Sequence, residues 1–353
     1  MNILIGEITS YKAIVIACYF NKYYPEVSIH TYDYNRFTSK IRTKYSGHHH
    51  LLKNENLESY LKEISKIIKQ EQINLFIPVH SDYIGEILKN KKLFGNSLFY
   101  LGNYTHYAKL HDKRSLHSIA NKLGLKVPLE YIDIKNAKIP FIGKPKKGSS
   151  AKGVVYILSE KDRKKFSARK FDNYIFQEYI KGIGCGYSVY AINGEIKTDY
   201  GHMRLAEYPV SGGSSVYRAH FFKEEMHEIA QKILSKIPWT GFAMFEFKLT
   251  PSDELVLIEV NPRIWGSINQ GLQNDTNYFK HIIYSEKISS DPVKLEKFTF
   301  LSPHVYLSFL LYALTGNLKP LTTFIRNIRY NKTDVSVFND PKAWLSMILR
   351  KIL

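Results

Sequence analysis

The stretch GFAMFEFKLTPSDELVLIEVNPRIWGS, residues 241–267, decides the fold of this 353-residue chain. Two apolar segments flank Pro251-Ser252-Asp253-Glu254, a run of turn-forming residues, so the stretch predicts a β-hairpin. Folding it about the centre of the turn pairs residues whose numbers sum to 505, which places Glu246 opposite Glu259. Side chains alternate along a strand, so Asn261 shares the face of Glu259. Three oxygen-donor side chains therefore meet on one face of an apolar ribbon.

The facing carboxylates indicate a cation site. Two glutamates directly opposite each other are unfavourable unless positive charge lies between them. Hard oxygen ligands prefer Mg²⁺, with Mn²⁺ as the alternative. Arg263 lies on the same face by alternation and would reach a phosphate oxygen bridged by the metal. A solvent-exposed hairpin face, on which charges are commonplace, is the competing interpretation.

This segment resembles the closing motif of the ATP-grasp superfamily, especially the carbamoyl-phosphate-synthetase-like branch with its E-x-N-P-R ending. The resemblance implies that Glu246, Glu259 and Asn261 hold two Mg²⁺ ions beneath ATP. It also implies that Arg263 contacts the phosphate that is transferred.

A second motif lies upstream, in PFIGKPKKGSSAKGV at residues 140–154. A predicted strand leads into a loop of small residues, whose backbone N–H groups can cup a phosphate. It is not a Walker loop, because Val154 follows Gly153 where Lys-Ser/Thr would be required. Taken alone the pattern favours a plain hairpin turn, whereas its position matches ATP-grasp order. The resemblance assigns Lys144 to the nucleotide phosphates and Gly148, Ser149, Ser150 and Gly153 to the flap over them.

Two further stretches resemble nucleotide-binding parts of the same family. Asp112-Lys113 opens a predicted helix, and Lys113 would be a second cation for the phosphates; an exposed helix lysine is the alternative. Residues 176–182, FQEYIKG, resemble the linker that recognises adenine, with the Glu178 carboxylate near the amino group and the backbone of Tyr179 and Ile180 along the purine edge. The carboxylate that many relatives use for the ribose is missing from the following residues, so ribose binding is unassigned.

The region between these motifs is predicted to bind the acceptor. Related sequences carry an R-x-x-E-x-P-x-x-G-G stretch here, and residues 204–213 match it. The resemblance assigns Arg204, Gly212 and Gly213 to the substrate, because an arginine can orient a carboxylate while backbone amides stabilise an acyl phosphate. Arg218 is a further candidate, with a surface salt bridge as the alternative. Arg263, Arg204 and Lys144 are the predicted catalytic cations.

Composition limits the function classes without selecting one. The net charge of +18 attracts polyanions, from nucleoside triphosphates to nucleic acid or anionic lipid. Two distant cysteines argue against a disulfide framework or a thiolate zinc site. The longest uncharged run, 301–317, is shorter than the roughly 20 residues that a spanning helix needs. We therefore expect a cytoplasmic protein.

The order of apolar segments predicts an α/β (α+β) chain in three parts. Residues 1–108 alternate strands and helices around a parallel, Rossmann-like sheet. Residues 109–290 form the two-subdomain ATP-grasp fold that the resemblance implies, and 291–353 form a helical segment in which Asp340-Pro341 starts the last helix. Ser97–Gly102 is expected to be a buried strand, and His48-His49-His50 an exposed loop.

The resemblance implies an Mg-ATP-dependent carboxylate–amine ligase that forms an amide through an acyl phosphate, on amino-acid or surface-sugar carboxylates. Two alternatives stay open: an ATP-grasp phosphotransferase that releases a phosphorylated product, and a basic nucleic-acid-binding module with a vestigial nucleotide site. We expect ATP, Mg²⁺, a small carboxylate and an amine as partners, and no nucleic acid. The last helix, with Trp344, Leu345, Ile348 and Leu349 on one stripe, would contact its own domain, a second subunit in a homodimer or a membrane surface.

Overall fold

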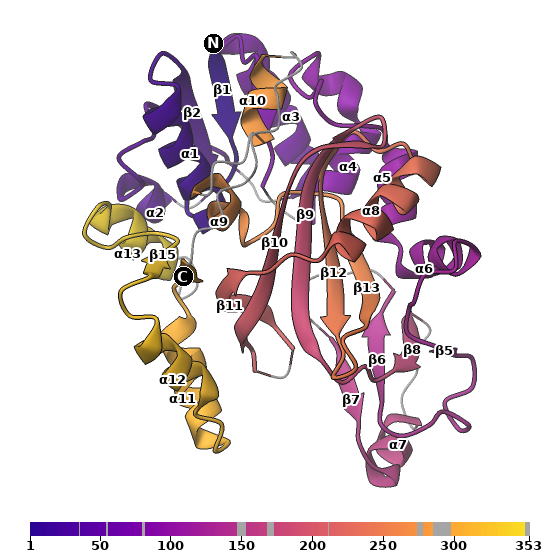
Figure 1. Cartoon of the computed structure of the whole chain (residues 1–353). Helices are drawn as coiled ribbons and strands as arrows, with labels where there is room; N and C mark the ends of the chain where they lie inside the picture. The colour runs from indigo at the N-terminus through magenta and orange to yellow at the C-terminus, as the bar shows by residue number, and fades with distance from the viewer. Residues whose placement is uncertain are drawn as a thin grey trace.

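The computed structural model describes residues 1–34, 36–53, 56–79, 82–146, 153–167, 173–210, 212–273, 278–284 and 298–349. Within these ranges the chain forms three β-sheets flanked by helices. Figure 1 shows the N-terminal sheet above, the long central sheet in the middle and the smaller sheet below it, while α11 and α12 form a separate arm.

The N-terminal sheet is parallel, with strand order β3-β2-β1-β4. Its strands are β1 (Asn2–Ile5), β2 (Ser28–Asp33), β3 (His48–Leu51) and β4 (Leu75–Ile77). Its helices are α1 (Tyr11–Tyr23), α2 (Arg36–Lys40), α3 (Leu57–Gln70), α4 (Ile84–Lys89), the 3₁₀ helix η1 (Lys91–Phe94) and α5 (Tyr104–His111). The predicted alternation of strands and helices is therefore confirmed in this part of the chain.

Two predictions about this sheet were wrong. Ser97–Gly102 forms consecutive turns rather than a strand, because its amides bond to carbonyls three residues back, as Leu101 does to Leu98. Leu98, Tyr100 and Leu101 are nevertheless buried, while Phe99 is exposed. His48-His49-His50, expected in an exposed loop, form edge strand β3, where His30 of β2 pairs with His48 in register. Parallel pairing with β2 thus overrode the polar character of the tract.

The central sheet has strand order β13-β12-β9-β10-β11-β14-β15. All neighbours are antiparallel except β14 and β15. The strands are β9 (Ile183–Ile192), β10 (Glu195–Tyr208), β11 (Ser214–His220), β12 (Gly241–Leu249), β13 (Leu255–Asn261), β14 (Thr299–Leu301) and β15 (Asn331–Thr333). The smaller sheet has order β5-β8-β6-β7, from β5 (Glu130–Tyr131), β6 (Phe141–Pro145), β7 (Val155–Ile157) and β8 (Tyr174–Glu178).

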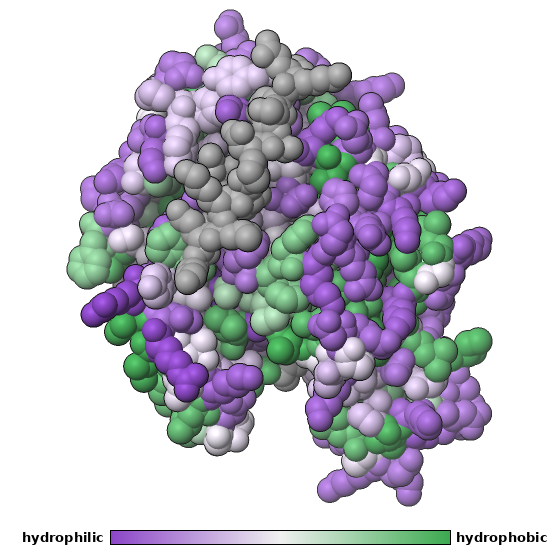
Figure 2. All heavy atoms as spheres, viewed as in Figure 1, coloured by the Kyte–Doolittle hydropathy of each residue, from purple (hydrophilic) through white to green (hydrophobic). Residues whose placement is uncertain are grey.

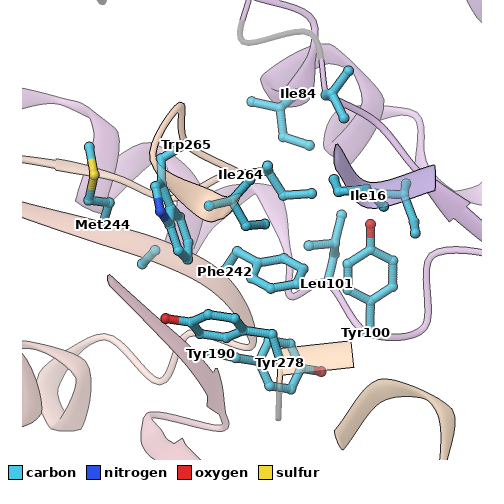
Figure 3. Close-up of a cluster of buried hydrophobic side chains, with 14 of the residues drawn as sticks. Ile16, Ile84, Tyr100, Leu101, Tyr190, Phe242, Met244, Ile264, Trp265 and Tyr278 are labelled. Atoms are coloured by element: carbon cyan, nitrogen blue, oxygen red, sulfur yellow. The ribbon is translucent and has the colours of Figure 1, made fainter. Parts of the chain in front are cut away.

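The core of the N-terminal sheet continues into the central sheet. One cluster of buried side chains includes Ile16 of α1, Leu101, Phe242 of β12 and Trp265. Figure 3 shows Phe242 and Ile264 from the hairpin region facing Ile16, Ile84 and Leu101. This shared apolar packing fixes the N-terminal sheet against the strands that carry the predicted metal ligands.

The remaining helices surround the sheets. They are α6 (Lys113–Lys122), α7 (Glu160–Ser167), α8 (Glu224–Lys236), α9 (Ile268–Gln273), α10 (Tyr278–Ile283), α11 (Val305–Leu314), α12 (Lys319–Arg326) and α13 (Pro341–Leu349). Asp340 caps α13 as predicted, since its side chain accepts from the Ala343 amide at 3.1 Å. The stripe on α13 is divided, with Trp344 packed on the core and Leu345 exposed, and Ile348 lies outside the side chains described. Among the described residues, no helix has the length and apolar character to cross a bilayer.

Candidate active site

A cavity of about 840 Å³ lies between the central and the smaller sheet. It brings together side chains from four separate predicted motifs. The sequence-predicted residues that line it are Lys144, Glu178, Tyr179, Ile180, Arg204, Gly212, Gly213, Glu246, Glu259, Asn261 and Arg263. Polar groups that converge in a cavity of this size mark a ligand site for a small molecule.

From Glu246 away from the turn, the hairpin β12–β13 has the register that the sequence predicts. Glu246 pairs with Glu259, and Met244 pairs with Asn261. A register shift between Glu246 and Phe247 then changes the alternation toward the turn. The two carboxylates therefore stand directly opposite each other at the cavity wall.

Two buried lysines surround Glu259. Lys113, the first residue of α6, places its Nζ 3.1 Å from Glu259 Oε2. Burial would raise the pKa of Glu259, but Lys113 and Lys144 lower it to about 2. Burial lowers the pKa of Lys144 to about 8. A phosphate beside Lys144 would favour the charged ammonium, so this end of the cavity is suited to an anion.

Glu246 is held from the other side by Arg204 of β10. The guanidinium Nη2 donates to Glu246 Oε2, and Nη1 lies 3.2 Å from Glu207 Oε1. Burial raises the pKa of Glu246 above its ordinary value, against the opposing effect of Arg204. Burial lowers the pKa of Arg204, but Glu246 and Glu207 outweigh that effect and raise it.

Asn261 stands where the two carboxylates converge. Its Nδ2 donates to Glu246 Oε1 at 3.0 Å and to Glu259 Oε1 at 3.2 Å. Its Oδ1 accepts from Arg263 Nη2 at 3.0 Å. A donor that reaches both carboxylates occupies the position a divalent cation would take, and rotating the amide would add Oδ1 to the ligands. The residues present therefore fit Mg²⁺ or Mn²⁺, which are held in proteins by one or two carboxylates together with substrate phosphates.

A β-bulge brings Arg204 and Glu207 to the same side of β10. Residues three apart on a regular strand face opposite ways, but the pairing of β10 with β11 shifts register between Arg204 and Ala206 and again between Ala206 and Glu207. Both polar side chains then line the cavity. Glu207 was not among the predicted site residues, although it occupies the Glu of the R-x-x-E-x-P-x-x-G-G pattern that identified Arg204.

The glycines near Arg204 have different roles. Gly213 accepts from Arg204 Nη1 at 3.2 Å, while its own N–H donates to the Pro209 carbonyl at 2.8 Å. That amide is therefore already used, which limits Gly213 as a donor to substrate. Gly212 has a φ of +118°, a conformation that favours glycine. Gly184 faces Arg204, because a Cβ there would lie 2.7 Å from Arg204 Cδ.

Apolar side chains and one exposed carboxylate, Glu178, line the cavity beside β8. Pro128, Ile142 and Leu158 line it. The Glu178 backbone N–H donates to the Leu129 carbonyl at 2.9 Å, which fixes the end of β8. An apolar slot with a carboxylate at its edge can accept a purine ring and its amino group. The predicted flap residues Gly148, Ser149 and Ser150 lie outside the described residues; Gly153 is described, with a φ of +77°.

Sequence reasoning missed the cavity residues contributed by other elements. Tyr11 and Lys12 reach the cavity from α1, and Trp265 to Ser267 follow the hairpin. The sequence carries no local signal for the α1 residues, because the fold alone brings them near the hairpin. Trp265 to Ser267 could have been found as the continuation of the Asn-Pro-Arg ending.

Arg218 does not reach the cavity. It is fully buried, with Nη2 2.5 Å from Asp334 Oδ1 and Nη1 3.3 Å from Ser302 Oγ. The interpretation of Arg218 as a substrate residue is therefore wrong, and so is the surface salt bridge. Its partner Asp334 follows β15 and lies far along the chain.

The fold and the site together place two facing carboxylates and several cationic side chains in one cavity between two sheets. The ATP-grasp domain family matches residues 110–267. The chain therefore contains an ATP-grasp domain. The predictions of this superfamily and of the fold class are thereby confirmed.

Three solved structures illustrate the likeness. The biotin carboxylase domain of 2-oxoglutarate carboxylase from Hydrogenobacter thermophilus, a dimer solved with MgADP, ADP and bicarbonate, is 12% identical, with a TM-score of 0.67 over 84% of this chain and 72% of that one. L-amino acid ligase from Bacillus licheniformis is 14% identical, with a TM-score of 0.60 over 84% and 78%. N5-carboxyaminoimidazole ribonucleotide synthetase from Thermotoga maritima is 15% identical, with a TM-score of 0.58 over 83% and 77%.

None of the curated proteins matches the sequence. At the identities of the three solved structures, the likeness concerns the fold. The matched ATP-grasp domain supports an ATP-dependent ligase whose substrate is unspecified.

Proposed function

We propose that this protein is an Mg-ATP-dependent carboxylate–amine ligase that activates a carboxylate as an acyl phosphate and passes it to an amine. The observation that carries the proposal is the convergence of Glu246, Glu259 and Asn261 at one point of a cavity, with cationic side chains on either side. Such a centre binds and polarises a triphosphate, and it has no evident use in a purely structural domain.

The phosphate end is built from cations and carboxylates. Glu246, Glu259 and Asn261 would hold two Mg²⁺ ions, which neutralise charge on the transferring phosphoryl group. Lys144 and Lys113 bind phosphate oxygens from the side of Glu259. Catalysis on such a group is largely positioning and electrostatic stabilisation.

Arg263 is the proposed contact to the transferred phosphoryl group. It lines the cavity, and its guanidinium is oriented by two acceptors, Asn261 Oδ1 and the Ile264 carbonyl, each at 3.0 Å. An arginine held in a fixed orientation presents its donors to a phosphate without a further ordering cost.

The nucleotide base would lie in the apolar slot beside β8. We assign the adenine amino group to Glu178 and the purine edge to the backbone of Tyr179 and Ile180. The flap of residues 148–153 stays a prediction from the sequence, as does the division of the chain into 1–108, 109–290 and 291–353.

Arg204 is the proposed acceptor-binding residue, with Gly212 and Gly213 in the loop beside it. Arg204 binds Glu246 and Glu207 through Nη2 and Nη1, while its buried Nε has no hydrogen-bond partner among the described residues and is left as a donor for a substrate carboxylate. A substrate carboxylate oxygen would attack the γ-phosphorus as the bond to the β–γ bridging oxygen breaks and ADP leaves. The amine would then attack the acyl carbon and lose a proton, and the C–O bond would break to release inorganic phosphate.

Amino-acid carboxylates are the proposed substrate class, with surface-sugar carboxylates as the second. The fold likeness to an L-amino acid ligase supports the first. The decisive experiment is to measure ADP release with Mg-ATP across a panel of carboxylates with and without amines, together with amide formation. ADP release that needs both substrates and yields an amide supports the ligase. ADP release with a carboxylate alone and a stable phosphorylated product would assign a phosphotransferase, and salt-sensitive nucleic-acid binding without ATP turnover would assign a binding module.

We expect Gly184→Ala to raise the KM for the carboxylate substrate about tenfold while leaving the KM for ATP unchanged. The added Cβ would meet Arg204 Cδ at 2.7 Å and Glu207 Oε1 at 3.0 Å, so the guanidinium must move away from the acceptor end. Initial-rate kinetics with each substrate varied separately would measure the two KM values. Equal changes in both KM values would contradict the assignment of Arg204 to the acceptor.

A further inference from the structure

We propose that the arm formed by α11 and α12 docks on an anionic lipid membrane surface. The docking element is the α11 face, defined as Tyr306, Leu307, Leu310 and Leu314. Their exposed fractions are 65%, 45%, 56% and 74%. At helical spacing these four side chains fall within about 100° around the helix axis, so they form one apolar stripe.

The opposite side of α11 explains why this stripe is not core. Val305 and Phe309 pack on Tyr217 of β11 in a small buried cluster. Phe324 of α12 packs against Phe309 with ring centroids 5.3 Å apart. The helix therefore has its apolar packing already, and the α11 face is additional apolar surface directed to solvent.

The apolar surface continues over the rest of the arm. Leu318, Ile325 and Ile328 are all exposed by more than half. Figure 2 shows hydrophobic residues gathered on this arm beside hydrophilic ones. Exposed apolar side chains gathered in this way mark an interaction site.

The charge of the arm is of one sign. Lys319, Arg326 and Arg329 are exposed next to this surface. Residues 298–333 contain four Lys/Arg and no Asp or Glu. The first acidic residue beyond them, Asp334, is buried against Arg218. Apolar side chains flanked by basic ones suit the interface of a bilayer with anionic lipids.

Charge also decides against a second copy of the chain as the occupant. A two-fold dimer through the α11 face would bring two sets of basic residues together without acidic partners from this segment. Since α11 has only ten residues, it would lie on the surface rather than cross the bilayer. The stripe on the last helix α13, for which a membrane surface was one of the alternatives, turns Trp344 toward the core.

The test is flotation of the full chain with lipid vesicles, without nucleotide, so that its outcome is independent of the ligase proposal. We expect binding to phosphatidylcholine vesicles with about 30% phosphatidylglycerol, weakened about tenfold without the anionic lipid or at about 1 M NaCl. The double variant Leu310→Ser/Leu314→Ser should bind about tenfold more weakly, and Arg326→Glu/Arg329→Glu should lose the preference for anionic lipid. All four side chains are exposed, so we expect the unfolding midpoints to be unchanged.

The matched control is Leu93→Ser/Ile132→Ser, which removes two exposed apolar side chains elsewhere on the chain and should bind like the wild type. Failure of the wild type to bind anionic vesicles, or equal binding by the Leu310/Leu314 variant, would overturn the proposal. So would a dimer in sedimentation velocity without lipid that the same variant dissociates. Binding to polyglutamate but not to vesicles would assign the arm to an acidic polypeptide and equally overturn it.

Discussion

Replacing Glu259 by glutamine is expected to lower Mg-ATP-dependent ADP release by about 10²–10³-fold. Glutamine keeps the shape of the side chain and removes its charge. Lys113, 3.1 Å from Glu259 Oε2, and the buried Lys144 would lose the anion that offsets them. Glu246 would then be the only carboxylate of the proposed metal site. The rate should be measured by an ADP-coupled assay over a range of Mg²⁺ concentrations.

The same hairpin offers a matched control. Glu254→Gln makes the identical chemical change in the turn, where Glu254 is exposed and pairs with Lys126. We expect this variant to keep the wild-type rate and Mg²⁺ dependence. A circular dichroism spectrum of Glu259→Gln like that of the wild type would exclude misfolding as the cause of its loss. Wild-type activity in the Glu259 variant would refute the proposed metal site.

The second large effect concerns stability. We expect Arg218→Leu to lower the free energy of unfolding by about 3–5 kcal/mol, because it leaves Asp334 charged and buried without its cation. Both side chains have no exposed surface. Ser302 and Asn269 would remain as the only neutral donors to Asp334 among the contacts described. Urea denaturation followed by fluorescence would measure the difference.

Two further variants separate charge burial from packing. Arg218→Leu/Asp334→Leu removes both charges and should restore most of the free energy of unfolding lost in Arg218→Leu. Replacing a buried ion pair by apolar residues is often neutral. Lys62→Ala removes an exposed partner of Glu58 on α3 and should leave the unfolding midpoint unchanged. A loss in the double variant as large as in Arg218→Leu would attribute the effect to packing rather than to an isolated charge.

The parts of the site that sequence could predict are local. Folding the hairpin about its turn predicted that Glu246 faces Glu259, and the structure reaches this pairing through a register shift between Glu246 and Phe247. The cap of α13 by Asp340 is local in the same way. The family resemblance supplied the order of the motifs along the chain, which brings Lys144 and Glu178 to the same cavity.

The parts that sequence could not predict depend on distant partners. Lys113 meets Glu259 only because α6 packs near β13, and Arg218 meets Asp334 only because β14 and β15 extend the sheet beyond β11. Edge strand β3 illustrates the same limit, since its histidines carry no strand signal and are ordered by pairing with β2. Ser97–Gly102 is the opposite case. A short apolar run predicted a strand there, but its buried residues lie in turns, and the apolar pattern alone does not distinguish the two.

Glu207 contacts both the cavity and the arm. Its carboxylate pairs with Arg204, while its carbonyl accepts from Ser308 Oγ at 2.8 Å and its N–H points to Tyr312 Oη at 3.4 Å, both on α11. A shift of α11 on docking would therefore move Glu207 and with it the position of Arg204. Thermodynamic linkage makes any such effect reciprocal. If membrane binding raises the affinity for the acceptor by some factor, acceptor binding raises the affinity for the membrane by the same factor.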